Sequence, residues 1–120
     1  ILSSVVLASL NSARQKSRDA RRIGDVKQLQ LALEMYYDST NGYPTSTASL
    51  APTYIPVQPL DPQTDTAYTY AVDGTSNYVL RATLESSHNA LAGDIDGEAN
   101  GQFTGSPDCS DDVYYYCVMP

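Results

Sequence analysis

The sequence has 120 residues, a common size for a single domain, and it contains ten Tyr, one Phe and no Trp. Its formal net charge of -7 combines a basic start with an acidic remainder, because residues 1–30 carry +4 and the other ninety carry -11. This acidic remainder argues against nucleic-acid binding by the isolated chain. The sequence contains no phosphate-binding Gly-rich loop, no zinc-ligand spacing and no pairing of a nucleophile with a general base. We therefore do not expect an enzyme.

Residues 1–38 contain no Pro and are predicted to form one continuous helix. Within residues 23–38, apolar side chains recur every three or four positions, which predicts one face buried against the rest of the chain. The positions on this face are Ile23, Val26, Leu29, Leu33 and Tyr36.

The beginning of the same helix has a different pattern, because apolar side chains surround most of its circumference. These residues are Ile1, Leu2, Val5, Val6, Leu7 and Leu10. A helix of this length would measure about 57 Å, whereas the remaining residues would form a body about 30 Å across. We therefore expect residues 1–22 to project as a polymerisation rod that is buried by partners or by lipid.

A basic run follows the apolar residues and comprises Arg14, Lys16, Arg18, Arg21 and Arg22. Taken alone it could contact nucleic acid or anionic lipid, and it could also be simply solvated. The acidic remainder of the chain favours contacts between subunits. We therefore add Arg14, Arg18 and Arg21 to the predicted polymerisation interface.

Residues 39–120 are predicted to form a globular head. Asn41-Gly42 is a helix stop signal, and five Pro between residues 44 and 62 indicate a rigid connector. Alternating side chains predict strands over residues 67–72 and 77–84, joined by a turn into an antiparallel hairpin, with a third strand over 113–118. The expected fold class is α+β, with a long N-terminal helix packed on a small antiparallel sheet.

The sequence has two cysteines, Cys109 and Cys117, and no further Cys or nearby His to complete a metal site. A disulfide is favoured over two free thiols, and it would indicate an oxidising compartment. It would close a loop in the C-terminal part of the head.

Three acidic residues, Asp94, Asp96 and Glu98, alternate beside glycines in residues 93–101. This pattern is typical of oxygen-rich calcium loops, although it lacks the twelve-residue register of an EF-hand. A calcium site and a solvated acidic loop are both open interpretations. No other cofactor and no catalytic residue are expected.

The segments ILSSVVLASLNSARQKSRDARR and DVKQLQLALEMYYDSTNGYP resemble the lower half of a type IV pilin or pseudopilin helix and its first loop. Tyr54-Ile55-Pro56, Leu60-Asp61-Pro62 and the Tyr-rich hairpin continue the resemblance to about residue 85. The cysteine pair is similar to the disulfide-bounded loop of many pilins. The family's leader, its cleavage site and its assembly glutamate are absent, so we expect a truncated form or the visible part of a processed subunit.

The resemblance implies a structural subunit of a type IV pilus, anchored in the inner membrane before assembly and then displayed on the cell surface. Its implied partners are copies of itself, the pilus assembly machinery and, before assembly, the membrane. A major pseudopilin of a type II secretion system is an alternative, which the acidic loop favours. A membrane-anchored adhesin or a DNA-uptake binding module is a third interpretation.

Overall fold

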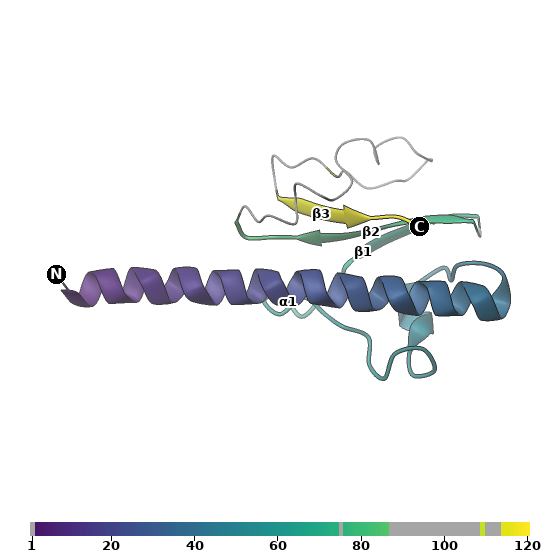
Figure 1. Cartoon of the computed structure of the whole chain (residues 1–120), viewed down its shortest axis with the longest axis horizontal. Coiled ribbons are helices and arrows are strands. Elements are labelled where there is room, and N and C mark those ends of the chain that lie inside the picture. Colours follow the sequence, from purple (N-terminus) through teal and green to yellow (C-terminus); the bar gives the residue numbers. More distant parts are fainter. Residues whose placement is uncertain (1, 75, 87–108, 110–113) are drawn as a thin grey trace.

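A computed structural model describes residues 2–74, 76–86, 109 and 114–120, with the side chains of residues 2–6 and 8 not described. Helix α1 (Leu2–Thr40) is followed by the short 3-10 helix η1 (Thr47–Leu50). The strands β1 (Thr69–Asp73), β2 (Asn77–Thr83) and β3 (Tyr115–Val118) come after it. Figure 1 shows α1 lying along one face of the sheet, with its N-terminal part extending past the head. The molecule is correspondingly elongated, measuring 59 × 32 × 20 Å.

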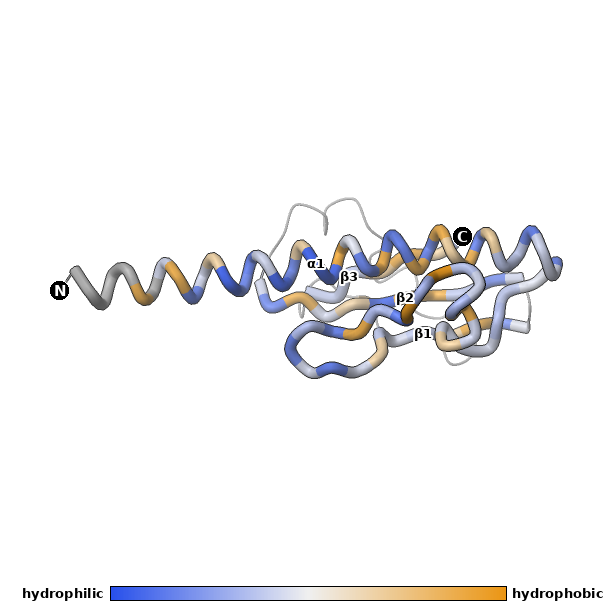
Figure 2. The backbone as a smooth tube through the Cα atoms, turned by 90° about the horizontal axis from the view of Figure 1, so that it is seen from below, coloured by the Kyte–Doolittle hydropathy of each residue, from blue (hydrophilic) through white to orange (hydrophobic). Residues whose placement is uncertain are grey.

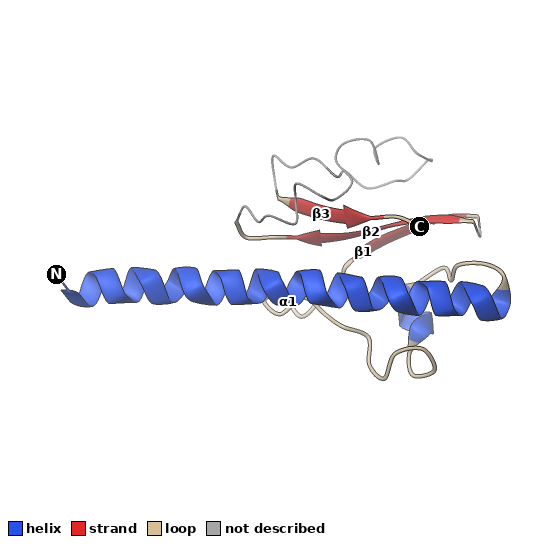
Figure 3. Ribbon diagram, in the orientation of Figure 1, coloured by secondary structure: helices blue, strands red, loops and turns tan. Residues whose placement is uncertain are grey.

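The three strands form one antiparallel sheet in the order β1-β2-β3 (Figure 3). Tyr70 pairs with Leu80 across the hairpin, and Leu80 also pairs with Val118 of β3. Gly74 has a φ of +59° in the turn between β1 and β2, a conformation that glycine adopts without a steric cost. The predicted α+β class, the hairpin and the third strand are therefore confirmed.

The core lies between α1 and the face of the sheet toward it, as the periodicity of both elements predicts. Four of the five predicted helix positions are buried, and Tyr36 is packed at the edge of the same cluster. Alternation along β2 turns its even-numbered residues toward the helix. The buried residues of this core include Ile23, Val26, Leu29, Leu33, Leu50, Tyr68, Tyr78, Leu80, Ala82, Leu84 and Tyr116.

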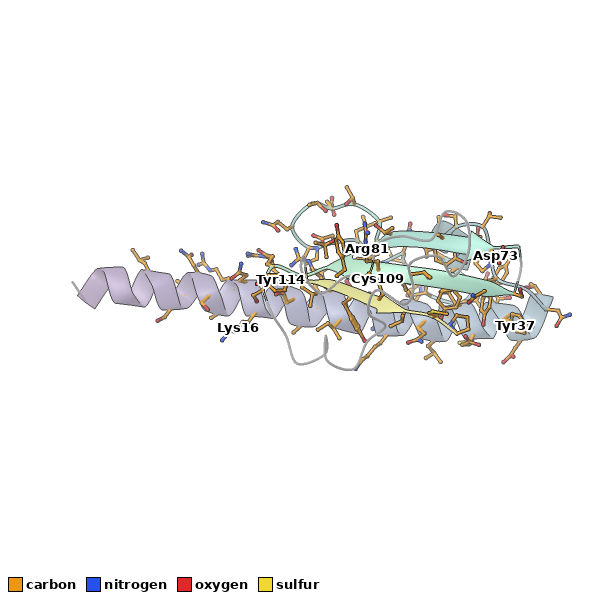
Figure 4. All side chains as sticks on the ribbon, turned by 90° about the horizontal axis from the view of Figure 1, so that it is seen from above. Lys16, Tyr37, Asp73, Arg81, Cys109 and Tyr114 are labelled. Carbon is orange, nitrogen blue, oxygen red and sulfur yellow. A yellow bond between two sulfur atoms is a disulfide. The ribbon has the colours of Figure 1, made fainter. Side chains whose placement is uncertain are left out.

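The opposite face of the sheet carries the disulfide. Cys109 is bonded to Cys117 of β3, which confirms the predicted pairing. Both cysteines pack against Val79, whose odd-numbered position on β2 turns it away from α1. Figure 4 looks onto this face and labels Cys109 and Arg81, the residue of β2 that pairs with Cys117. The disulfide therefore ties the C-terminal strand to residue 109.

Helix α1 ends two residues later than predicted, at Thr40. Asn41 has a φ of 62°, and its backbone N–H donates to the carbonyl of Tyr37 at 2.7 Å. This left-handed residue after the last helical position is a common C-terminal signal, so the predicted stop at Asn41-Gly42 is confirmed. Figure 1 shows the connector that follows largely on the side of α1 away from the sheet.

The division of α1 into a projecting part and a packed part differs from the expectation. Residues 1–22 were predicted to project, but the buried residues of α1 already include Asp19 and Arg22. Within the described part of the chain, the first hydrogen bond from α1 to the head is donated by Gln15 to the carbonyl of Glu85. The contact between α1 and the head therefore begins nearer the N-terminus than predicted, because charged residues of α1 bind the head in addition to the apolar ones.

Candidate functional site

The N-terminal part of α1, residues 2–14, precedes its first hydrogen bond to the head and is called the rod from here on. Two views at right angles show it extending past both the sheet and the connector (Figures 1 and 2). Leu7 is 60% exposed and Leu10 is 43% exposed. Arg14 is also exposed, and Lys16 is exposed close to the beginning of the head (Figure 4). The rod therefore presents apolar side chains that the head does not cover.

A buried cluster of charges fixes α1 to the head shortly after the rod, and its centre is Arg22, of which only 2% is exposed. The Arg22 guanidinium donates to Asp61 of the connector through Nε at 2.7 Å and Nη2 at 3.1 Å. Its Nη1 donates to Glu85, just after β2, at 2.6 Å and to Asp19 of α1 at 2.8 Å. One arginine thus binds the helix, the connector and the end of the sheet.

The other members of this junction cluster complete its hydrogen bonds. Arg18 makes two hydrogen bonds of 2.6 Å to the carboxylate of Glu85. Asp19, of which 1% is exposed, accepts from the backbone N–H of Glu85 at 2.8 Å and from that of Ser86 at 3.1 Å. Charge-assisted bonds of this kind are stronger than neutral ones. The junction cluster comprises Arg18, Asp19, Arg22, Asp61 and Glu85.

The electrostatics of the junction cluster follow from these contacts. The hydrogen bond from Arg22 lowers the pKa of Asp61 to about 2, and two backbone N–H groups that bind the carboxylate act in the same direction. The hydrogen bond from Arg18 is the largest cause that lowers the pKa of Glu85 to about 2. Burial alone would lower the pKa of Arg22, but hydrogen bonds to its three carboxylates outweigh burial and raise it. Arg18, Arg22, Asp61 and Glu85 are thus held in their charged forms.

A second polar contact lies further along the helix, where the buried Tyr68 donates to Asp25 at 2.7 Å. Burial and this hydrogen bond raise the pKa of the Tyr68 hydroxyl above its ordinary value. Arg21 approaches the same carboxylate only to 3.8 Å, and its side chain is 63% exposed. Arg21 therefore contributes a surface ion pair, in contrast to the buried Arg22.

An exposed apolar surface lies on the head itself, where α1 meets the connector. Leu31 is 64% exposed and Met35 is 44% exposed. With Tyr54 and Pro56 of the connector they line a shallow groove of about 200 Å³. We call these four residues the outer patch.

The residues predicted to form the polymerisation interface do not all lie exposed on the rod. Leu7, Leu10 and Arg14 lie exposed on the rod, while Arg18 is bound to Glu85 within the same chain. For Leu2, Val5 and Val6 the structure describes only the helical backbone, and Ile1 lies outside the described residues. The proposed calcium residues Asp94, Asp96 and Glu98 also lie outside the described residues.

Sequence reasoning missed the junction cluster. Asp19 and Arg22 are spaced i, i+3 on a helix, which is a detectable pairing signal. Their partners Asp61 and Glu85 are 39 and 63 positions away from Arg22, so no local pattern brings them together.

Among the described residues there is no group of three His, Cys, Asp or Glu that could hold a metal ion. Over the same described residues, no helix is long and apolar enough to span a membrane.

The fold and the site define an α+β chain in which a long helix, exposed at its N-terminal end, is fixed to a small antiparallel sheet by buried charges. Searches of models of protein families, of curated proteins and of solved structures found no match to this chain.

Proposed function

We propose that this chain is a structural subunit of a type IV pilus, which polymerises through its N-terminal helix into a surface filament. The observation that carries this proposal is the rod, where Leu7 and Leu10 are exposed on a helix that continues past the head. Fully burying one Leu is worth about 1.5–3 kcal/mol, so an exposed apolar helix is stabilised by packing against another copy. A soluble monomer would leave this free energy unused.

Further support comes from the way that the rod and head are joined. Residues 15–22 of the continuous helix bind the head through Gln15 and the junction cluster, so a force on the rod would act directly on the folded head. A filament subunit needs such a link, because its helix joins the polymer while its head remains on the outside. The resemblance of residues 1–44 and of the Tyr-rich hairpin to type IV pilins points to the same function.

In this proposal the subunit is stored in the inner membrane, extracted by the pilus assembly machinery, and buried through its helix among identical copies. The Cys109–Cys117 disulfide fits this route, because such bonds persist in oxidising compartments outside the cytosol. The pseudopilin alternative depends on the acidic loop at residues 94–98, which lies outside the described residues.

Electron microscopy of material sheared from cells that produce this chain tests the proposal. We expect long filaments that carry the subunit. We expect Leu7→Asp with Leu10→Asp to abolish them, because two charges would have to be buried in the packed helices. The matched control places two Asp on the head, Thr45→Asp with Ser49→Asp, at positions that are exposed, and it should assemble.

Circular dichroism of each variant shows whether the head is still folded, since the rod contributes no residue to the core of the described structure. Normal filaments from the rod variant would refute assembly through the rod. Subunits that accumulate in the periplasm without surface filaments would favour the secretion pseudopilus over the pilus.

A further inference from the structure

The outer patch is an exposed apolar surface on a helix face that points away from the core. Leu31 and Met35 are spaced i, i+4, and Asp38 continues the same stripe at i+7. All three side chains are exposed. The described part of the chain gives Asp38 no ion pair, so its charge is available to a partner.

The rod carries a stripe of matching character. Leu7, Leu10 and Arg14 are spaced i, i+3 and i+7, so they also share one helix face. Both stripes therefore consist of two apolar residues followed by one charge. The charges are opposite, because Arg14 ends the stripe of the rod and Asp38 ends that of the head.

The two stripes match only in one relative orientation. Leu7 and Leu31 differ by 24 positions, as do Arg14 and Asp38, so parallel helices displaced by that number bring both pairs together at once. Leu10 then lies beside Met35. An antiparallel arrangement with the same apolar contacts would instead bring Arg14 next to Lys27 and leave Asp38 without a basic partner. Charge therefore selects the parallel arrangement.

The same displacement leaves room for both heads. Along α1 of the first copy, the contacts with the head begin at Gln15. Gln15 would be level with Ser39 of the second copy, one residue before α1 of that copy ends. The first head would therefore lie beyond the end of the second helix and would not overlap the second head. A displacement of 24 residues corresponds to about 36 Å along the helix axis.

We propose that the outer patch binds the rod of a second copy of this chain, parallel to α1 and displaced by 24 residues, with Arg14 of one copy paired with Asp38 of the other. This inference rests on the proposed function, because it names the surface of the head that receives the polymerising helix. It assigns a binding role to Leu31 and Met35, which do not belong to the rod.

Chemical cross-linking of assembled filaments tests the contact. The variant Leu7→Cys with Leu31→Cys, treated with a short bis-maleimide, should give a ladder of cross-linked subunits in denaturing gels. The control Leu7→Cys with Ser76→Cys places the second thiol at an exposed position in the β1–β2 turn. It should give no ladder, because the proposed contact does not bring that turn to the rod.

A charge exchange tests the direction of packing without cysteines. Arg14→Asp and Asp38→Arg should each reduce the amount of filament at least about tenfold, because each places like charges in contact. The combined variant should recover to within about twofold of the original, since it restores an opposite pair. Thermal melting of the two single variants shows that their heads are folded.

The outcomes separate the two proposals. Absence of filaments from the original chain would refute the proposed function, and the inference with it. Filaments whose Leu7→Cys/Leu31→Cys variant cross-links no more than the control would overturn the inference and leave the proposed function standing. If the cysteine variant does not assemble, the charge exchange decides, and failure of the combined variant to recover overturns the inference.

Discussion

Replacing Arg22 by Met should destabilise the head strongly, because it removes the group that binds all three carboxylates of the junction cluster. Arg22 is buried, and its guanidinium contacts Asp19, Asp61 and Glu85 at 2.6–2.8 Å. Removing one partner of a buried ion pair costs about 3–5 kcal/mol, since the remaining charge is left without compensation. Arg18 still neutralises Glu85 in this variant, so we expect a loss at the lower end of this range, about 3 kcal/mol.

The loss caused by Arg22→Met is measured as the change in the free energy of unfolding of the full chain. Unfolding is followed in urea at neutral pH with the disulfide intact. The matched control is Arg21→Met, which removes the same type of side chain from the neighbouring position. Arg21 is mostly exposed and approaches Asp25 only to 3.8 Å, so the control should cost less than about 1 kcal/mol. In thermal melting, a loss of about 3 kcal/mol corresponds to a shift of about 10 °C or more for a chain of this size.

The difference in the free energy of unfolding between Arg22→Met and Arg21→Met tests whether the junction cluster holds α1 on the head. If Arg22→Met and Arg21→Met unfold at the same urea concentration, the junction cluster does not hold α1 on the head. A second variant, Arg22→Lys, keeps the charge but loses the planar geometry that binds the three carboxylates together. It should lie between the original chain and Arg22→Met.

Three further measurements test other parts of the structure. Because the pKa values of Asp61 and Glu85 are lowered in the folded chain, the free energy of unfolding should fall as the pH decreases from about 5 to about 2. For Asp61 this loss is about 2 kcal/mol. Urea unfolding at constant ionic strength that shows no loss over this range would contradict the prediction. Replacing Cys109 and Cys117 together by Ser should cost about 2.5 kcal/mol in the same assay, since the eight-position separation closes a short loop, and an unchanged midpoint would refute a stabilising disulfide. Gly24 is exposed in the middle of α1, and a Cβ added there would meet no atom within 4 Å, so Gly24→Ala should raise the free energy of unfolding by about 1 kcal/mol, whereas a decrease would mean that the helix needs glycine at this position.

The sequence predicted the elements whose signals are local. The spacing of Ile23, Val26 and Leu33 is a helical period, and all three are buried against the sheet. Asn41 adopts the left-handed conformation that ends a helix, as its place before Gly42 indicates. Periodicity and turn chemistry act within a few residues, which is why α1 and the hairpin could be placed before the structure was known.

The sequence did not predict where the helix meets the head, because charged residues determine that position. A basic run at the surface of a helix is normally solvated, and Arg22 has the same local surroundings as Arg21. Only the folded chain brings Asp61 and Glu85 to Arg22 and leaves Arg21 exposed. The outer patch had a usable signal, because Leu31 and Met35 are apolar residues four positions apart that lie off the stripe formed by the buried core residues.

The junction cluster also has a geometric consequence for the proposed assembly. Apolar contacts between α1 and the sheet are non-directional, so they tolerate small rotations of the helix about its axis. The hydrogen bonds of Arg22 are directional, and they reach Asp61 in the connector and Glu85 at the end of β2 from a single side chain. They therefore oppose rotation of α1 relative to the head. Because α1 is continuous from residue 2 to residue 40, the direction in which Leu7 and Leu10 point is then fixed relative to the connector and the sheet of the same chain. Identical copies can repeat one contact along a filament only if that direction is the same in every copy.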